Sequence, residues 1–119
     1  MLYAILCYHN EAEVGSWPKE KDDEVLAKRR VIKDKLRAQN RLGPVARLMP
    51  TTAATTVRGR DAIVLDGPFA ETKEQLLGFY VVDCEKLEDA IEVARGFVRE
   101  GGGAMEVRPV RIFEAGNAK

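Results

Sequence analysis

The sequence predicts an α+β domain, with a ferredoxin-like antiparallel sheet and two helices on one face. Short apolar runs at residues 2–8, 63–65 and 76–82 are typical of strands, whereas two other segments repeat apolar residues with helical spacing. The expected order is strand, helix, strand or hairpin, strand, helix and strand. This order suits one antiparallel sheet that is covered by helices on one side.

Length and composition indicate a single soluble domain that spans residues 1–119. The chain is 45% hydrophobic and 32% charged, which differs from the composition of disordered proteins. Nineteen basic residues balance nineteen acidic ones, which argues against nucleic acid or an anionic membrane as a partner. Residues 2–8 are too short to span a membrane and lack the features of a signal peptide, so we expect a cytoplasmic protein.

The first half of the chain is expected to contain two strands and a long helix. Residues 2–8 are apolar on both alternating faces, as in a strand covered on two sides. A loop follows, and residues 19–40 then form a highly charged helix with a narrow apolar stripe. We expect Gly43 and Pro44 to end this helix, and residues 45–49 to form a short strand.

A hairpin and a second central strand are expected next. Residues 51–57 are rich in β-branched side chains, residues 63–65 are apolar, and Arg58-Gly59-Arg60-Asp61 between them is typical of a turn. Residues 76–82 resemble the first strand because they are apolar on both faces. The sequence therefore predicts a hairpin followed by a buried strand.

The last third of the chain predicts a helix and a strand. Apolar residues recur with helical spacing over residues 87–98, and three glycines at 101–103 end the pattern. Residues 105–113 are the last expected strand, and Pro109 places it at an edge or a bulge because proline has no N–H to donate. Residues 114–119 are expected to be frayed.

The apolar character of the two central strands also predicts an assembly. Two helices cover only one face of the sheet, yet residues 2–8 and 76–82 are apolar on both faces. A second copy of the chain is the simplest cover for the other face. The sequence therefore predicts a homodimer that forms through the sheet face.

Four segments carry a resemblance to a known family. They are "TTAATTVRGRD" at 51–61, "LDGPFAETKEQLLGFYVVD" at 65–83, "EDAIEVA" at 88–94 and "MEVRPVRIF" at 105–113. With these segments the chain resembles the YCII-related family, in particular its branch marked by an Asp-Gly-Pro-Phe turn. The resemblance implies a dimeric α+β barrel, in which two ferredoxin-like sheets face one another. Some relatives with this fold isomerise or dehalogenate small lactones, and the YCII group has been proposed to use a His and Asp pair.

His9 is the only histidine and lies at the end of the first expected strand. Its imidazole, with an ordinary pKa of about 6.5, suits a general acid or base, whereas the alternative is a polar residue at a strand end. A lone imidazole without a cysteine cluster does not supply a usual ligand set, so no metal and no cofactor are expected. Cys7 and Cys84 lie in apolar runs and are interpreted as reduced packing residues.

Asp66 is the second catalytic candidate, because its carboxylate follows an apolar run, where burial would raise its pKa. The alternative is a turn residue that hydrogen-bonds to the backbone. Phe69 is expected to anchor this turn to the core. Glu71, Lys73 and Glu74 follow, either as ligand-binding residues at the polar rim of a pocket or as surface ion pairs.

Three further residues are ligand-binding candidates. Arg47 and Arg58 lie on the strands after the first helix, where a guanidinium on the inner face could clamp an anion. The alternative is a solvated edge residue that discourages aggregation. Tyr80 lies on a central strand, where its hydroxyl needs a partner.

These observations lead to two hypotheses about function. The first is a small-molecule enzyme with lactone isomerase or dehalogenase-like acid–base chemistry, in which His9 and Asp66 transfer protons and Lys73 or an arginine supplies charge. The second is a non-catalytic dimeric module that binds a metabolite or regulates another process. The expected ligand in both cases is a small molecule, and the candidate cations suit an anionic one. If His9 and Asp66 converge in one pocket, the enzyme hypothesis gains support; if they do not, it loses support.

Overall fold

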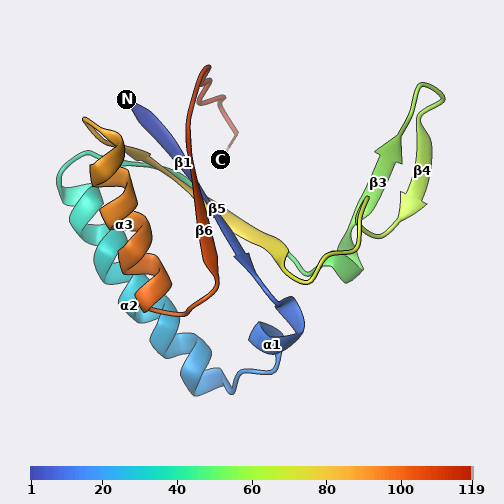
Figure 1. Cartoon of the computed structure of the whole chain (residues 1–119), viewed down its shortest axis with the longest axis horizontal. Coiled ribbons are helices and arrows are strands. Elements are labelled where there is room, and N and C mark those ends of the chain that lie inside the picture. Colours follow the sequence, from blue (N-terminus) through green and yellow to red (C-terminus); the bar gives the residue numbers. More distant parts are fainter. Residues whose placement is uncertain (119) are drawn as a thin grey trace.

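The computed structural model describes residues 1–118 and has an α+β fold (Figure 1). In chain order the elements are β1 (Leu2–His9), α1 (Glu11–Gly15), α2 (Lys19–Ala38), β2 (Leu42–Arg47), the 3₁₀ turn η1 (Thr51–Ala53), β3 (Thr55–Arg58), β4 (Ile63–Asp66), β5 (Gln75–Asp83), α3 (Leu87–Arg99) and β6 (Ala104–Pro109). No helix within residues 1–118 is long and apolar enough to cross a membrane.

Four strands form one antiparallel sheet in the order β2-β5-β1-β6. β1 pairs with β5 and with β6, and β2 pairs with β5, and all three pairs are antiparallel. Helix α2 therefore joins two parallel strands, β1 and β2, with β5 between them. Helix α3 likewise joins β5 and β6, with β1 between them. The two βαβ units are therefore interleaved, as in the split βαβ arrangement. The sheet ends at β2 and β6, so one chain forms no closed barrel among the described residues.

The core lies between one face of the sheet and the helices α2 and α3, which lie side by side on that face (Figure 1). On β1 the side chains of Tyr3, Ile5 and Cys7 alternate toward this core and are buried. Phe97 of α3 is fully buried and stacks on Tyr80 of β5, with ring centroids 3.9 Å apart. The helical spacing predicted for residues 87–98 thus forms the buried stripe of α3.

The opposite face of the sheet is less covered. Ala4 and Leu6 point away from the core and are only half-buried. Leu6 is paired with Phe79 of β5, which is also half-buried. The second apolar face that the sequence predicted for the central strands is therefore present and faces outward.

Two elements differ from the prediction in the first half of the chain. The segment expected to be a loop contains α1, because the Asn10 side chain accepts a hydrogen bond from the Glu13 N–H at 2.9 Å and caps a single turn. Strand β2 begins at Leu42 and contains Gly43 and Pro44, where a helix end was expected. Proline is accommodated because β2 is an edge strand whose register is irregular between Leu42 and Val45.

Two more boundaries differ in the second half. The first three residues of the predicted strand 51–57 form η1, so β3 contains only four residues. The predicted strand 105–113 ends at Pro109, although the next residue, Val110, still donates its N–H to the Leu2 carbonyl oxygen at 2.8 Å. Residues 114–118 contain no helix or strand, and residue 119 of the expected frayed tail lies outside the described residues.

The predicted hairpin is present as β3 and β4, which form a two-stranded sheet of their own (Figure 1). It projects from the body of the domain. Phe69, which follows β4 in the Asp-Gly-Pro-Phe turn, is 76% exposed. The expectation that this ring anchors the turn to the core of its own chain is therefore wrong.

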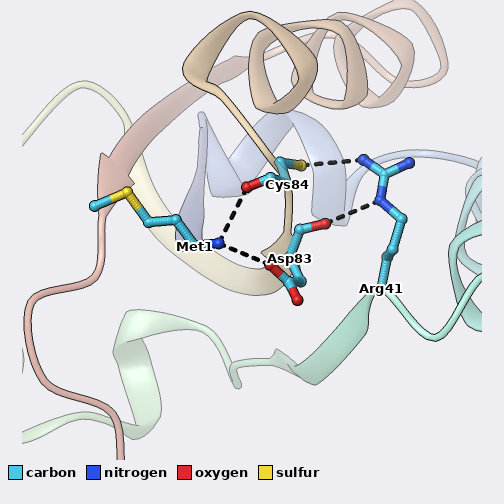
Figure 2. A network of polar contacts seen from close by, with 4 residues as sticks. All are labelled: Met1, Arg41, Asp83 and Cys84. Atoms are coloured by element: carbon cyan, nitrogen blue, oxygen red, sulfur yellow. Dashed lines mark hydrogen bonds and ion pairs between the residues drawn. The ribbon is translucent and has the colours of Figure 1, made fainter.

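A polar network ties the N-terminus to the end of β5 (Figure 2). The Met1 ammonium lies 3.0 Å from the Asp83 carboxylate and 3.2 Å from the Cys84 carbonyl oxygen. Arg41 donates to the Asp83 carbonyl oxygen at 2.9 Å and lies 3.2 Å from the Cys84 sulfur. The network joins the start of β1, the residue before β2 and the end of β5, although its exposed ion pair adds little stability.

Replacing Phe97 with alanine is expected to lower the free energy of unfolding by about 3–5 kcal/mol, because the ring is fully buried and stacked. Phe69→Ala is the matched control, since it removes the same ring from an exposed position and is expected to cost about 0.5 kcal/mol or less. Urea denaturation at low protein concentration measures both values. Equal losses in the two variants would contradict this description of the core.

Candidate functional site

A pocket of about 110 Å³ lies between α2 and the β2–β5 side of the sheet, and we call it the helix–sheet pocket. A cavity of this size has room for several water molecules or a small organic group. Its lining residues are Cys7, His9, Val14, Trp17, Asp22, Val25, Leu26, Arg29, Lys33, Val45, Ala46, Arg47, Leu77, Gly78, Phe79 and Tyr80. Most of this lining is apolar, and three of its four charged side chains are cations.

The secondary structure explains why these side chains converge. Alternation along β1 directs Cys7 to the helix-covered face, and its register partner on β5 is Gly78. A side chain cannot replace Gly78 without movement, because a Cβ atom there would lie 2.3 Å from the Ala46 carbonyl oxygen. The absence of a side chain at this position lets β2 approach β5 closely.

Arg29 is the central polar group of the pocket. Its guanidinium donates to the Phe97 carbonyl oxygen at 3.0 Å, and another of its nitrogens lies 4.0 Å from the Cys7 sulfur. The Nε–H is buried and has no hydrogen-bond partner among residues 1–118. A buried donor without an acceptor costs free energy, so an acceptor from a ligand would stabilise the protein here once the side chains that cover this N–H move.

Cys7 and Tyr80 add neutral polar groups to the same pocket. Burial raises the pKa of the Cys7 thiol, and the positive charge of Arg29 offsets only part of that effect. Burial likewise raises the pKa of the Tyr80 phenol, again with a smaller opposing effect of Arg29. Cys7 therefore stays a thiol near neutral pH, which argues against a nucleophilic role for it.

Two further cations lie in the pocket lining. Arg47 lies 3.2 Å from the Asp22 carboxylate, and both side chains are partly exposed. Lys33 projects from α2, one helical turn after Arg29. Since Asp22 is the only carboxylate in the lining, the pocket carries a net positive charge.

His9 enters the pocket from the end of β1. Its Nδ1 accepts a hydrogen bond from the Asn10 backbone N–H at 2.8 Å, so the proton of the neutral ring is on Nε2. The ring contacts Trp17 edge to face, with centroids 5.8 Å apart. It also lies against Gly103, whose positive φ and missing Cβ permit the contact. In this state His9 is a hydrogen-bond donor rather than a base.

The structure places the predicted site residues in separate regions. His9, Arg47 and Tyr80 lie together in the helix–sheet pocket. Asp66 and Glu71 line a different, open and polar hollow with Thr51, Thr52, Gly67, Pro68, Ala70, Thr72 and Gln75. His9 and Asp66 therefore do not share a pocket within one chain.

The other two predicted residues also lie outside the helix–sheet pocket. Lys73 has an exposed side chain, and its carbonyl oxygen accepts a long hydrogen bond from the Asn10 side chain at 3.4 Å. Arg58 ends β3 on the projecting hairpin and is exposed. Within residues 1–118 no group of three or more His, Cys, Asp or Glu side chains is placed to hold a metal ion.

Sequence reasoning missed Arg29, a cation of the pocket whose Nε atom is buried. A signal for it is present in the sequence. Val25, Ile32 and Leu36 form part of the apolar stripe of α2, and Arg29 lies at the same spacing on this stripe. A charged residue on the buried face of a helix needs a partner, so this position is a site candidate on spacing alone.

The fold and the pocket define an α+β domain with an apolar, positively charged cavity between helix and sheet. The family model described as the YCII-related domain matches residues 1–114, and the chain belongs to this family. The chain is similar to an uncharacterised protein of Rhizobium meliloti (strain 1021), with 48% identity over 120 residues. This match covers 98% of the chain and 97% of the relative, so it extends over nearly all of both.

The raised pKa values predict that the protein loses stability in alkaline solution. The unfolded chain releases the Cys7 proton near the ordinary pKa of 9.0 and the Tyr80 proton near 10.0, whereas the folded chain keeps both to higher pH. The unfolded state then binds fewer protons, so the free energy of unfolding falls as the pH rises through this range.

Urea denaturation between neutral pH and pH values above these two measures the effect. Tyr80→Phe keeps the ring that stacks on Phe97 but removes the phenol, so this variant should lose less stability at the alkaline end. Identical pH profiles for the wild type and this variant would contradict a raised Tyr80 pKa.

Proposed function

We propose that the protein binds a small organic anion with an apolar body in the helix–sheet pocket. The single observation that carries the proposal is the buried Nε–H of Arg29, which has no acceptor among the described residues. A carboxylate oxygen is the acceptor that best fits a guanidinium, because the hydrogen bond is charge-assisted. The remaining walls, which include Val25, Leu26 and Val45, suit the apolar part of such a ligand.

The other polar groups of the pocket support the same ligand class. Lys33 and Arg47 add positive charge to the lining. A bound carboxylate would compete with Asp22 for Arg47, whose pairing distance of 3.2 Å and partial exposure indicate a replaceable contact. His9 donates through Nε2, and Tyr80 keeps its phenolic proton, so both are suited to an acceptor.

Of the two hypotheses from the sequence, the binding or regulatory module has the better support. An acid–base enzyme with His9 and Asp66 needs both side chains at one substrate, and they line different cavities in one chain. One observation favours catalysis as a second candidate. The Nε2–H of His9, which lines the pocket, could donate a hydrogen bond to the oxyanion that develops on a substrate in lactone isomerase-like or dehalogenase-like chemistry.

The proposal includes a homodimer formed through the outward face of the sheet, as in the dimeric α+β barrel that the Asp-Gly-Pro-Phe branch of the family implies. The half-buried Leu6 and Phe79 support it, because two such faces would cover one another. Leu6→Lys places a charge at the centre of this face and leaves the core side untouched. Sedimentation equilibrium should give at least twice the 13.2 kDa chain mass for the wild type and a lower mass for the variant.

A pair of arginine and lysine variants decides where an anion binds. Arg47→Met removes a cation from the helix–sheet pocket, and Lys73→Met removes one from the polar rim near the Asp66 turn. We expect Arg47→Met to weaken binding of small carboxylic acids by about tenfold or more, and Lys73→Met to bind like the wild type. Thermal-shift titration with a panel of aromatic and aliphatic acids measures the affinities.

Arg30→Met is the matched control, because Arg30 is exposed on α2 next to Arg29 and lines neither cavity. If Lys73→Met loses binding and Arg47→Met keeps it, the ligand lies at the polar rim instead. A wild-type protein that none of the acids stabilises would overturn the proposal.

A further inference from the structure

The β3–β4 hairpin with the turn that follows it, residues 55–69, forms an arm outside the body of the domain (Figure 1). It pairs with no strand of the four-stranded sheet. The radius of gyration of the chain is 15.6 Å, whereas a compact domain of this length has about 13.5 Å. The arm therefore extends the molecule instead of adding to its core.

The arm exposes apolar side chains on both of its faces. Val57 and Val64 are register partners on one face, and each is 65% exposed. Ile63 and Leu65 lie on the other face and are also exposed, as is Phe69 at the base of the arm. An isolated two-stranded hairpin is only marginally stable in water, and an exposed apolar patch of this kind indicates a contact surface.

The two ends of the arm carry opposite charges. Two arginines, Arg58 and Arg60, and one carboxylate, Asp61, lie at or beside the tip, which is therefore net positive. The base and the loop that follows it contain three carboxylates, Asp66, Glu71 and Glu74, against the single cation Lys73. An arm with this charge distribution is complementary to a second arm that runs in the opposite direction.

We propose that the arm is a self-association surface, and that two copies of this chain pack arm against arm in antiparallel orientation. A two-fold axis brings the basic tip of each arm to the acidic base of the other, so every attractive contact occurs twice. The same contact removes Val57, Val64 and Phe69 from water. A second copy is the occupant because the charge pattern complements itself and no other component is needed.

This contact is independent of the pocket and of the outward face of the main sheet, because none of its residues belongs to either surface. It covers the exposed face of the hairpin on which Val57 and Val64 lie. Since the attraction is partly between exposed charges, it should weaken as the ionic strength rises.

A charge-swap experiment tests the proposal. Arg58→Glu with Arg60→Glu makes both ends of the arm acidic, and Glu71→Lys with Glu74→Lys makes both ends basic. Each double variant alone should associate at least about tenfold more weakly than the wild type, and an equimolar mixture of the two should recover the loss. Sedimentation velocity over a dilution series measures association, and circular dichroism checks that each variant is folded.

Arg95→Glu with Arg99→Glu is the matched control, because it changes the net charge by the same amount as Arg58→Glu with Arg60→Glu, but at exposed positions of α3. This control should associate like the wild type. Val57→Thr with Val64→Thr keeps β-branched side chains in the strands and should also weaken association.

The outcomes separate the arm contact from the sheet-face dimer. The charge-swap variants are compared in the wild-type background and in the Leu6→Lys background, which removes only the sheet-face contact. Recovery in the mixture, in either background, supports the arm contact. The arm contact would be overturned if each double variant alone associates like the wild type in both backgrounds. It would also be overturned if the mixture associates no more strongly than its two components. Neither result would affect the pocket proposal.

Discussion

The partly buried side chain of Arg29 makes the interaction that connects α2 to both α3 and the sheet. It projects from the apolar stripe of α2, donates to the Phe97 carbonyl oxygen in the last part of α3, and lies beside the Cys7 sulfur on β1. Moving such a charge out of water is costly unless hydrogen bonds replace its hydration. This contact adds to the packing of Ile32 and Leu36, which place α2 against α3 and the sheet.

The same side chain determines what the helix–sheet pocket can bind. Two of its interactions hold the fold together, whereas its buried Nε–H has no acceptor among the described residues. The neighbouring Cys7 and Tyr80 keep their protons, because burial raises the pKa of each. The pocket thus combines fixed positive charge with neutral groups, which favours an anion and disfavours a cation.

Much of the fold could be predicted from local sequence, because its strongest signals are local. The apolar runs of β1 and β5, the helical spacing of α3 and the turn between β3 and β4 each specify their element directly. The short helix α1 could not be predicted, because one cap from Asn10 stabilises a single turn. Strand β2 begins before its predicted start, because Pro44 is tolerated in an edge strand with an irregular register. This tolerance depends on tertiary pairing and is not visible in the local sequence.

The site was predicted only in part, because convergence of side chains is a property of the whole fold. Strand position suggested Arg47 and Tyr80, and these do line one pocket with His9. The family resemblance suggested that Asp66 acts together with His9, but the two residues line separate cavities. Arg29 was not recognised as a site residue, because α2 contains so many charged residues that one cation on its apolar stripe does not stand out.

The most direct test of the central claim is an NMR titration that observes the arginine Nε–H groups while benzoate is added. Arg29→Lys assigns the signal of Arg29 by its loss. A carboxylate that accepts from this N–H should move the Arg29 signal downfield in a saturable manner, while the signal of the exposed Arg30 stays in place. An unchanged Arg29 signal at ligand concentrations that stabilise the protein would contradict an anion site at this guanidinium.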